Sequence, residues 1–238
     1  MVESITERIT KIRSNLPASI RLIAVTKQVS VDAIRTAYAA GIRDFGENKV
    51  QEAEEKQAQL QDLPEITWHL IGHLQTNKAA KALKQFQWIH SVDNLKLAQR
   101  LDRLAEELSC SPNICLQVKI LPDPNKYGWS IPELITDLPE LNQCQHLKIK
   151  GLMTIPPQGL DHGQTLSVFE KTQELAQEIS KKNLSNLNIQ ELSMGMSEDY
   201  NLAITAGTTM VRLGRILFGE RSRITHKNVE SSSPLGRK

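Results

Sequence analysis

The stretch Arg21-Leu-Ile-Ala-Val-Thr-Lys-Gln-Val-Ser30 joins an apolar run to a cation. Its four consecutive apolar residues, Leu22 to Val25, are typical of a strand that is buried on both faces. Such strands belong to parallel sheets, in which helices return the chain to the start of the next strand. Core packing does not explain Lys27, which follows the strand directly. The stretch therefore predicts an α/β fold and a functional residue at the end of its first strand.

Apolar runs of this kind recur along the chain, and patterns typical of helices separate most of them. The clearest helical pattern runs from Asn94 to Ser109, where leucines at positions 97, 101, 104 and 108 form one stripe. A second helix is expected at about 163–182, and a leading helix at about Glu3 to Asn15. The expected strands lie near residues 20–27, 43–45, 66–71, 86–91, 113–120, 148–153, 190–194 and 210–213.

This alternation of strands and helices favours one fold class. Parallel pairing needs a crossover between strands, and about eight such units favour a (β/α)8 TIM barrel over an open doubly wound sheet. No Gly-x-Gly-x-x-Gly motif follows a strand, so the fingerprint of a dinucleotide fold is missing. We therefore expect one α/β barrel domain over residues 1–221, with an extra N-terminal helix, and a polar, disordered tail over residues 222–238.

The composition argues against several classes of function. The 238-residue chain has a net charge of +2 and 4% aromatic residues, which is not typical of a nucleic-acid-binding surface. Cys110, Cys115 and Cys144 have no metal-binding spacing, and their odd number argues against a disulfide framework. No apolar run reaches the roughly 20 residues of a membrane span, and the N-terminus has no signal-peptide core. These features predict a cytoplasmic protein without a metal or membrane site.

Polar residues follow several of the expected strands. In a TIM barrel the carboxyl-terminal ends of the strands form the mouth that carries the active site, and core packing does not explain polar residues there. Five segments are expected to open onto this mouth: Lys27, Asp44-Phe-Gly-Glu-Asn48, His69-Leu-Ile-Gly-His-Leu-Gln75, Ser193-Met-Gly-Met-Ser197 and Arg212-Leu-Gly-Arg215.

The last two segments indicate a phosphate site, because barrels often hold phosphate in the loops after strands seven and eight. Ser193 and Ser197 offer hydroxyl groups, and Ser197 is expected to cap a helix whose N–H groups face an anion. Gly207-Thr-Thr209 and Gly214 add small residues and donors. Arg212 is expected to place its charge beside a ligand oxygen or a ring nitrogen.

Lys27 stands on another side of the same mouth. A lysine in a largely apolar setting has a lowered pKa and becomes a nucleophilic amine. An amine that faces a phosphate site points to an aldehyde with a phosphate arm, and pyridoxal 5′-phosphate (PLP), held as a Schiff base, has that chemistry. Since lysine heads at strand ends usually reach water, this prediction depends on the phosphate site.

The spacing of these segments also resembles that of the pyridoxal-phosphate homeostasis proteins of the YggS/PROSC type. The resemblance extends from about residue 4 to about residue 221, with the motifs in the same order. They are Ala24-Val-Thr-Lys27, Phe45-Gly-Glu-Asn48 with Val50-Gln-Glu52, Trp68-His-Leu-Ile-Gly-His-Leu-Gln-Thr-Asn-Lys78, Gly151-Leu-Met-Thr154, Leu192-Ser-Met-Gly-Met-Ser197, and Val211-Arg-Leu-Gly214 with Ile216-Leu-Phe-Gly219.

The resemblance implies a fold-type III barrel like the N-terminal domain of alanine racemase, with PLP as a Schiff base on Lys27. It implies a monomer that buffers or delivers PLP without a catalytic residue, and PLP-dependent apo-enzymes as transient partners. Two methionines, Met194 and Met196, can reach the ring, and Met194 is included among the contacts. The implied cofactor contacts are Lys27, Asn48, Ser193, Met194, Ser197, Thr209, Arg212 and Gly214.

The chain departs from the family pattern in two places. Lys49 stands where relatives often carry an aromatic residue, and Lys119 stands where many carry an asparagine, which makes Lys119 a rival amine. Lys126 still matches the family's Lys-x-Gly and is a candidate for secondary attachment of PLP.

Two other functions stay open at this point. A small fold-type III amino-acid racemase would need a second acid–base residue opposite Lys27, and Tyr127 is the tyrosine expected on a mouth loop. Racemases of this type also need a second domain, for which the chain is too short. A barrel for another phosphate ligand, such as a sugar-phosphate isomerase, would stay colourless when PLP is added.

Several polar residues have a simpler structural interpretation. His69 and His73 are expected to form hydrogen bonds at the mouth and not to bind a metal. Arg215 is expected to pair with an acidic neighbour. A solvated helix face is the expected role of Glu52, Glu54, Glu55 and Lys56.

Overall fold

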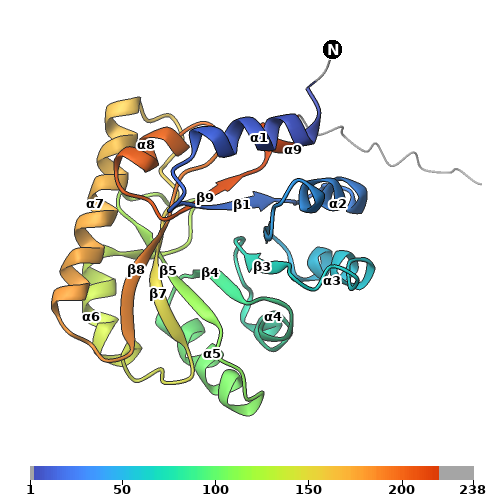
Figure 1. Ribbon diagram of the computed structural model, residues 1–238. Helices are drawn as coiled ribbons and strands as arrows, with labels where there is room; N and C mark the ends of the chain where they lie inside the picture. The colour runs from blue at the N-terminus through green and yellow to red at the C-terminus, as the bar shows by residue number, and fades with distance from the viewer. Residues whose placement is uncertain (1–2, 220–238) are drawn as a thin grey trace, which may run out of the picture.

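A closed parallel β-barrel forms the centre of the molecule (Figure 1). The computed structural model describes residues 3–219. In that range β1 pairs with both β2 and β9, and β4 pairs with β5, so the sheet closes on itself. Around the barrel the strands are β1 (Arg21–Val25), β2 (Asp44–Glu47), β3 (Thr67–Leu70), β4 (Trp88–Val92), β5 (Asn113–Lys119), β7 (Lys148–Met153), β8 (Leu187–Ser193) and β9 (Met210–Leu213).

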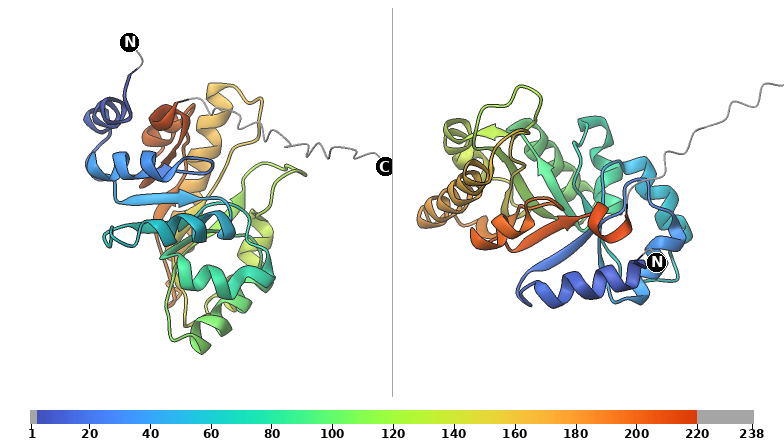
Figure 2. Two further views of the ribbon diagram at one scale, coloured as in Figure 1. Left: turned by 90° about the vertical axis from the view of Figure 1, so that its right-hand side faces the viewer. Right: turned by 90° about the horizontal axis from the view of Figure 1, so that it is seen from above.

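Helices form an outer layer around the strands, as the two views of Figure 2 show. The predicted leading helix is α1 (Ile5–Asn15), which begins with a capping box between Ser4 and Glu7 and packs against α2 and α9. A two-residue strand, β6 (Trp129–Ser130), pairs with the end of β5 and was not predicted. The other helices are α2 (Val31–Ala39), α3 (Val50–Gln59), η1 (Thr76–Lys78), α4 (Ala79–Gln85), α5 (Leu95–Glu107), α6 (Ile131–Leu141), α7 (His162–Lys181), α8 (Tyr200–Thr205) and α9 (Arg215–Phe218).

The predicted (β/α)8 barrel is therefore confirmed. The barrel supplies two separate apolar regions, and β1 shows how they arise. Leu22 and Ala24 belong to the large core between strands and helices, whereas Ile23 faces the barrel interior. Successive side chains of a strand point to opposite faces, so each strand contributes to both regions. The interior cluster comprises Ile23, Trp88, Cys115, Met153 and Met210.

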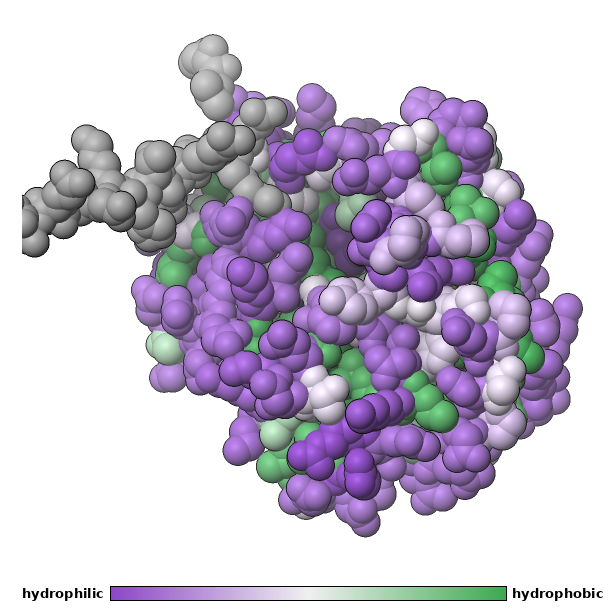
Figure 3. All heavy atoms as spheres, turned by 180° about the vertical axis from the view of Figure 1, so that it is seen from behind, coloured by the Kyte–Doolittle hydropathy of each residue, from purple (hydrophilic) through white to green (hydrophobic). Residues whose placement is uncertain are grey.

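The outer surface of the molecule is mainly hydrophilic on the face seen from behind (Figure 3). Figure 3 shows one face on which hydrophilic residues predominate and hydrophobic residues form small, separate patches. Among the helices of residues 3–219, none is long and apolar enough to cross a membrane. In the same range, no group of three or more histidine, cysteine or acidic side chains is arranged to hold a metal ion. The tail expected over residues 222–238 lies outside the described residues.

Replacing Gly151 with alanine is expected to destabilise the barrel. A Cβ atom at Gly151 would lie 1.9 Å from the carbonyl oxygen of Glu191 on the paired strand β8, so the two strands would have to separate. Overpacking of this kind costs about 1–3 kcal/mol, and a clash with backbone should place the loss at the upper end. Urea unfolding measures the effect. Gly163→Ala is the control, because its nearest contact at 3.4 Å is a side-chain oxygen and alanine favours a helix; an equal loss for both variants would contradict the packing argument.

Candidate functional site

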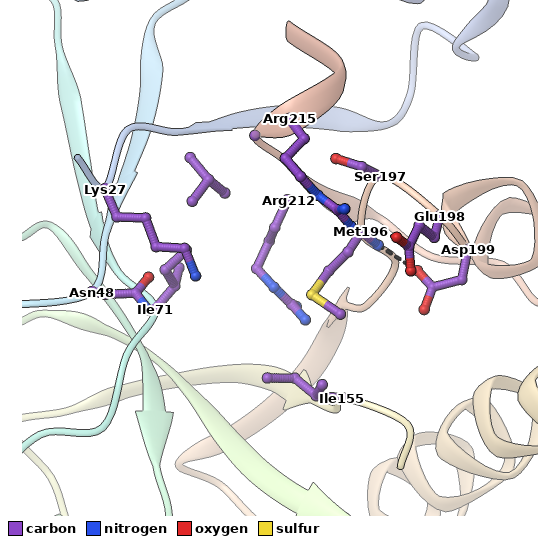
Figure 4. A pocket seen from close by; sticks show the side chains of 12 residues that line it. Lys27, Asn48, Ile71, Ile155, Met196, Ser197, Glu198, Asp199, Arg212 and Arg215 are labelled. Atoms are coloured by element: carbon purple, nitrogen blue, oxygen red, sulfur yellow. Dashed lines mark hydrogen bonds and ion pairs between the residues drawn. The ribbon is translucent and has the colours of Figure 1, made fainter. Parts of the chain in front are cut away.

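A pocket of about 300 Å³ opens at the carboxyl-terminal mouth of the barrel. Figure 4 shows Lys27 and Asn48 on one side of it, and Arg212 with the segment Met196–Asp199 on the other. Ile71 and Ile155 supply apolar walls. The pocket therefore combines an amine, a guanidinium and apolar surface at the position that the strand ends predicted.

The backbone on both sides of Lys27 is held by a buried ionic cluster. The Nζ of Lys56 donates hydrogen bonds to the Thr26 carbonyl oxygen (2.6 Å) and to carboxylate oxygens of Glu47 and Glu52 (2.7 Å each). Glu52 in turn accepts a 2.5 Å hydrogen bond from the backbone N–H of Gln28, whose φ of 59° is left-handed. Lys27 itself is half-buried between these two fixed neighbours.

This cluster corrects the prediction of a solvated helix face. Glu54 and Glu55 are exposed as expected, but Lys56 is only 7% exposed. Glu47, at the end of β2, is fully buried, and burial raises the pKa of its carboxyl group above the ordinary value although Lys56 and Thr26 donate hydrogen bonds to it. Helix α3 therefore turns one cation inward, because the strand ends present oxygen atoms that a hydrogen-bond donor must satisfy.

Arg212 forms the floor of the pocket from β9 and is 4% exposed. Its Nη1 donates to the carbonyl oxygen of Ser193 (2.5 Å) and to the hydroxyl of Ser193 (2.6 Å), and its Nη2 donates to the Thr154 carbonyl oxygen (3.0 Å). Burial lowers the pKa of Arg212 to about 10, which still leaves the guanidinium charged at neutral pH. The pocket thus has a fixed positive charge opposite Lys27.

The segment after β8 turns sharply at Gly195, whose φ is 95°. A Cβ atom there would lie 2.7 Å from the Cβ of Ala203, so the position needs glycine. The prediction that Ser197 caps the following helix was wrong: α8 begins after Asp199, whose Oδ1 accepts a 2.6 Å hydrogen bond from the N–H of Met196. Ser197 is therefore free of a capping role and lines the pocket.

The structure brings together only part of the predicted set. Ser193 and Met194 are fully buried and do not line the pocket; of the two methionines, Met196 lines it. Thr209 corrects the prediction most clearly, because it precedes β9 and so lies at the opposite, amino-terminal end of the barrel, where its hydroxyl donates to Glu191 (2.6 Å). The predicted residues that do line the pocket are Lys27, Asn48, Ser197, Arg212 and Gly214.

The two other candidate lysines lie outside the lining of this pocket. The Nζ of Lys126 donates to the carbonyl oxygens of Ile155 (3.2 Å) and Pro156, and burial lowers its pKa. Lys119 lines separate depressions beside β6 and α6. Position therefore favours Lys27 over both as the amine of the pocket.

His69 and His73 form hydrogen bonds, as predicted, but His69 is fully buried within β3 and does not open onto the carboxyl-terminal mouth. His69 bonds to Asp44 and His90, and His73 bonds to Asp93 (2.9 Å each). The ring of His73 also stacks on Tyr127, with 3.6 Å between ring centroids. Arg215 pairs with Glu198, again as predicted. His90 and the wall residues Ile71 and Ile155 were not predicted to be site residues. A histidine within a strand run, or an isoleucine just after one, carries no signal that distinguishes a site from a core.

Comparisons with known proteins agree with this architecture. Residues 2–222 match the sequence model of the alanine racemase N-terminal domain. The chain is 52% identical over 212 residues to the pyridoxal phosphate homeostasis protein of Synechocystis sp., covering 89% of this chain and 96% of the relative. The chain belongs to the pyridoxal phosphate homeostasis protein family. Its counterpart in Pseudomonas aeruginosa is 42% identical over 205 residues, which are 86% of each chain.

Solved structures in this family have the same barrel. PipY of Synechococcus elongatus, with PLP bound, has a TM-score of 0.87 and 52% identity, covering 91% of this chain and all of PipY. An alanine racemase of Clostridium difficile has a TM-score of 0.75 at 16% identity, covering 92% of this chain and 60% of the racemase. At that identity the similarity supports the shared fold alone, so the family relation rests on the homeostasis proteins.

Proposed function

We propose that this chain binds PLP in the pocket at the carboxyl-terminal mouth, holds it as a Schiff base on Lys27, and serves in PLP homeostasis by buffering or delivering the cofactor. The observation that carries the proposal is the placement of Lys27 opposite the buried, charged Arg212 in one pocket. The homeostasis names of its relatives and the PLP bound to PipY support it. PLP supplies an aldehyde that condenses with an amine and a phosphate by which a protein can hold it.

The residues present fit this cofactor. Lys27 offers the amine, and Arg212 and Ser197 offer donors on the opposite side. Gly214 keeps the wall open: a Cβ atom there would lie 3.4 Å from the Val25 carbonyl oxygen and would fill space beside the strand end. Asn48 lines the pocket next to Lys27. The phosphate group is best accommodated near Ser197 and Gly214, two small lining residues that leave the backbone accessible.

A carrier role is favoured over an amino-acid racemase by what surrounds Lys27. No tyrosine is among the described residues that line the pocket. Tyr127 is 56% exposed and stacks on His73 outside the pocket lining. The acidic groups nearby are engaged, Glu198 with Arg215 and Asp199 with the Met196 N–H. The pocket therefore lacks a positioned second acid–base group for inverting an amino acid.

Incubation with D- and L-amino acids should accordingly give no sustained inversion, and Tyr127→Phe should bind PLP within about twofold of the wild type, because that hydroxyl does not line the pocket. Chiral chromatography over many enzyme equivalents measures the first result, and absorbance titration measures the second. Sustained turnover that Tyr127→Phe abolishes would establish the racemase instead.

Delivery of the cofactor is tested by loading the protein with PLP, removing free PLP by desalting, and adding a PLP-dependent apo-enzyme. Recovery of the acceptor's activity, with loss of the carrier's visible absorbance, supports a transient encounter with such enzymes. We further propose a cytoplasmic monomer; sedimentation measures the oligomeric state. A protein that stays colourless with PLP would contradict the proposed function and favour another phosphate ligand.

A further inference from the structure

A continuous chain of side-chain hydrogen bonds crosses the barrel interior. It begins at Asp44, the first residue of β2, whose Oδ1 lies 2.9 Å from Nε2 of His69. Nδ1 of His69 lies 2.9 Å from Nε2 of His90, and Nδ1 of His90 lies 2.8 Å from the Ser193 hydroxyl. That hydroxyl accepts from Arg212 at 2.6 Å. The chain therefore connects the amino-terminal mouth with the floor of the pocket at the opposite mouth.

The Asp44 end of this chain fixes the direction of every hydrogen bond in it when both imidazoles are neutral. An ionised carboxylate only accepts, so Nε2–H of His69 donates to Asp44. The bare Nδ1 of His69 then accepts from Nε2–H of His90, and the bare Nδ1 of His90 accepts from the Ser193 hydroxyl. The oxygen of that hydroxyl accepts from Arg212. Each contact holds one proton, and both imidazoles are neutral Nε2–H tautomers.

The reverse direction fails at Asp44. It would place Nδ1–H on both rings and turn a bare Nε2 of His69 toward the carboxylate, so that two acceptors would face each other at 2.9 Å. A protonated His90 would add a second buried positive charge close to Arg212. Asp44 is thus the group that selects the direction.

Burial supports the neutral state of both rings. His69, His90 and Ser193 have no exposed surface, and the rings lie against Trp88. Burial lowers the pKa of His69, against the pull of Asp44, and lowers the pKa of His90 further, with His69, Arg212 and Arg21 adding repulsion.

We propose that Asp44, His69, His90 and Ser193 are positioning residues for the pocket: the carboxylate at the far mouth orders a one-directional hydrogen-bond chain that holds the Arg212 guanidinium in place for its ligand. The inference deepens the proposed function, since that ligand is PLP. The hydrogen bond from Arg212 Nη1 to the Ser193 hydroxyl requires the serine proton to point away from the guanidinium, as it does when it is donated to His90. A change at Asp44 should therefore alter the hydrogen bond between Ser193 and Arg212 at the opposite end of the barrel.

The proton arrangement is tested in the protein without PLP, by ¹⁵N NMR of the histidine side chains. We expect His69 and His90 to be Nε2–H tautomers that stay neutral below the ordinary imidazole pKa of about 6.5. In Asp44→Asn the amide can donate or accept, so Nδ1–H tautomers should become populated. Glu191→Gln is the matched control, because this carboxylate bonds to Thr209 and lies outside the chain. Nδ1–H tautomers in the wild type, or unchanged tautomers in Asp44→Asn, would overturn the inference.

The link to the pocket is tested by two replacements of His90. In His90→Asn the side-chain oxygen can still accept from Ser193, whereas His90→Leu removes the acceptor. We expect His90→Leu to weaken PLP binding about tenfold or more, because the hydrogen bond from the charged Arg212 to Ser193 is lost with it. His90→Asn should retain most of the wild-type affinity. Urea unfolding without PLP first establishes a temperature at which both variants are folded. PLP binding is then compared at that temperature. Equal affinity for both variants would overturn the positioning role, whereas failure of the wild type to bind PLP would reject only the proposed function and leave the NMR result standing.

Discussion

Replacing Lys56 with methionine is expected to lower the free energy of unfolding by about 3–5 kcal/mol, the usual cost of removing one partner from a buried ion pair. The variant leaves the fully buried Glu47 without its cation. The second oxygen of Glu47, Oε2, already has no hydrogen-bond partner among the described residues. Urea unfolding of the protein without PLP measures the loss. Lys81→Met is the matched control, because Lys81 pairs with Glu54 at the surface, where such pairs contribute at most about 1 kcal/mol.

The same variant should respond to pH in a defined direction. The pKa of Glu47 is raised in the folded state, so stability falls as pH rises from the unfolded value of 4.5 through the folded pKa. Without Lys56 the folded pKa rises further and this loss grows. The defect should therefore be smaller at pH about 5 than at pH about 8, and Lys56→Met with Glu47→Gln should recover part of it. A defect independent of pH, with no recovery, would contradict the ionic origin of the stability.

Replacing Lys27 with alanine is expected to weaken PLP binding by at least about 100-fold, or about 2.8 kcal/mol at about 1.4 kcal/mol per tenfold change. The covalent contribution disappears while Arg212 and the loop after β8 remain. Lys27→Arg separates charge from reactivity, because a guanidinium keeps the charge and stays protonated, and it should be nearly as defective. Absorbance titration measures both variants, with Lys126→Ala as the control that retains wild-type affinity. Wild-type affinity in Lys27→Ala would show that another group binds the cofactor.

The fold was predictable because its signals are local. Continuous apolar runs such as Leu22–Val25 record burial on both faces, and the strand ends then identify the mouth. Lys27, Asn48, Ser197, Arg212 and Gly214 were found for this reason, since each follows or closes a strand. Thr209 was misplaced because it was grouped with Gly214, although the two residues flank opposite ends of the strand expected at 210–213. A residue that precedes a strand lies at the amino-terminal mouth, and one that follows it lies at the carboxyl-terminal mouth.

The buried ionic and polar groups were not predictable from local patterns. Lys56 lies in a charged helical segment that is typical of a solvated face, and its burial depends on Thr26 and Glu47, which the fold brings to it. His90 lies within an apolar strand run, and its partners His69 and Ser193 come from β3 and β8. Such contacts arise only when the barrel closes, so neither periodicity nor spacing contains them.

The most direct test of the proposed cofactor site is borohydride reduction of the PLP-loaded protein, followed by mass spectrometry of its peptides. We expect one reduced pyridoxyl group on Lys27, with little on Lys119 or Lys126, and no reducible attachment in the pocket of Lys27→Ala. A stable label on another lysine of the wild type, or an intact yellow, reducible adduct in Lys27→Ala, would contradict the proposed site.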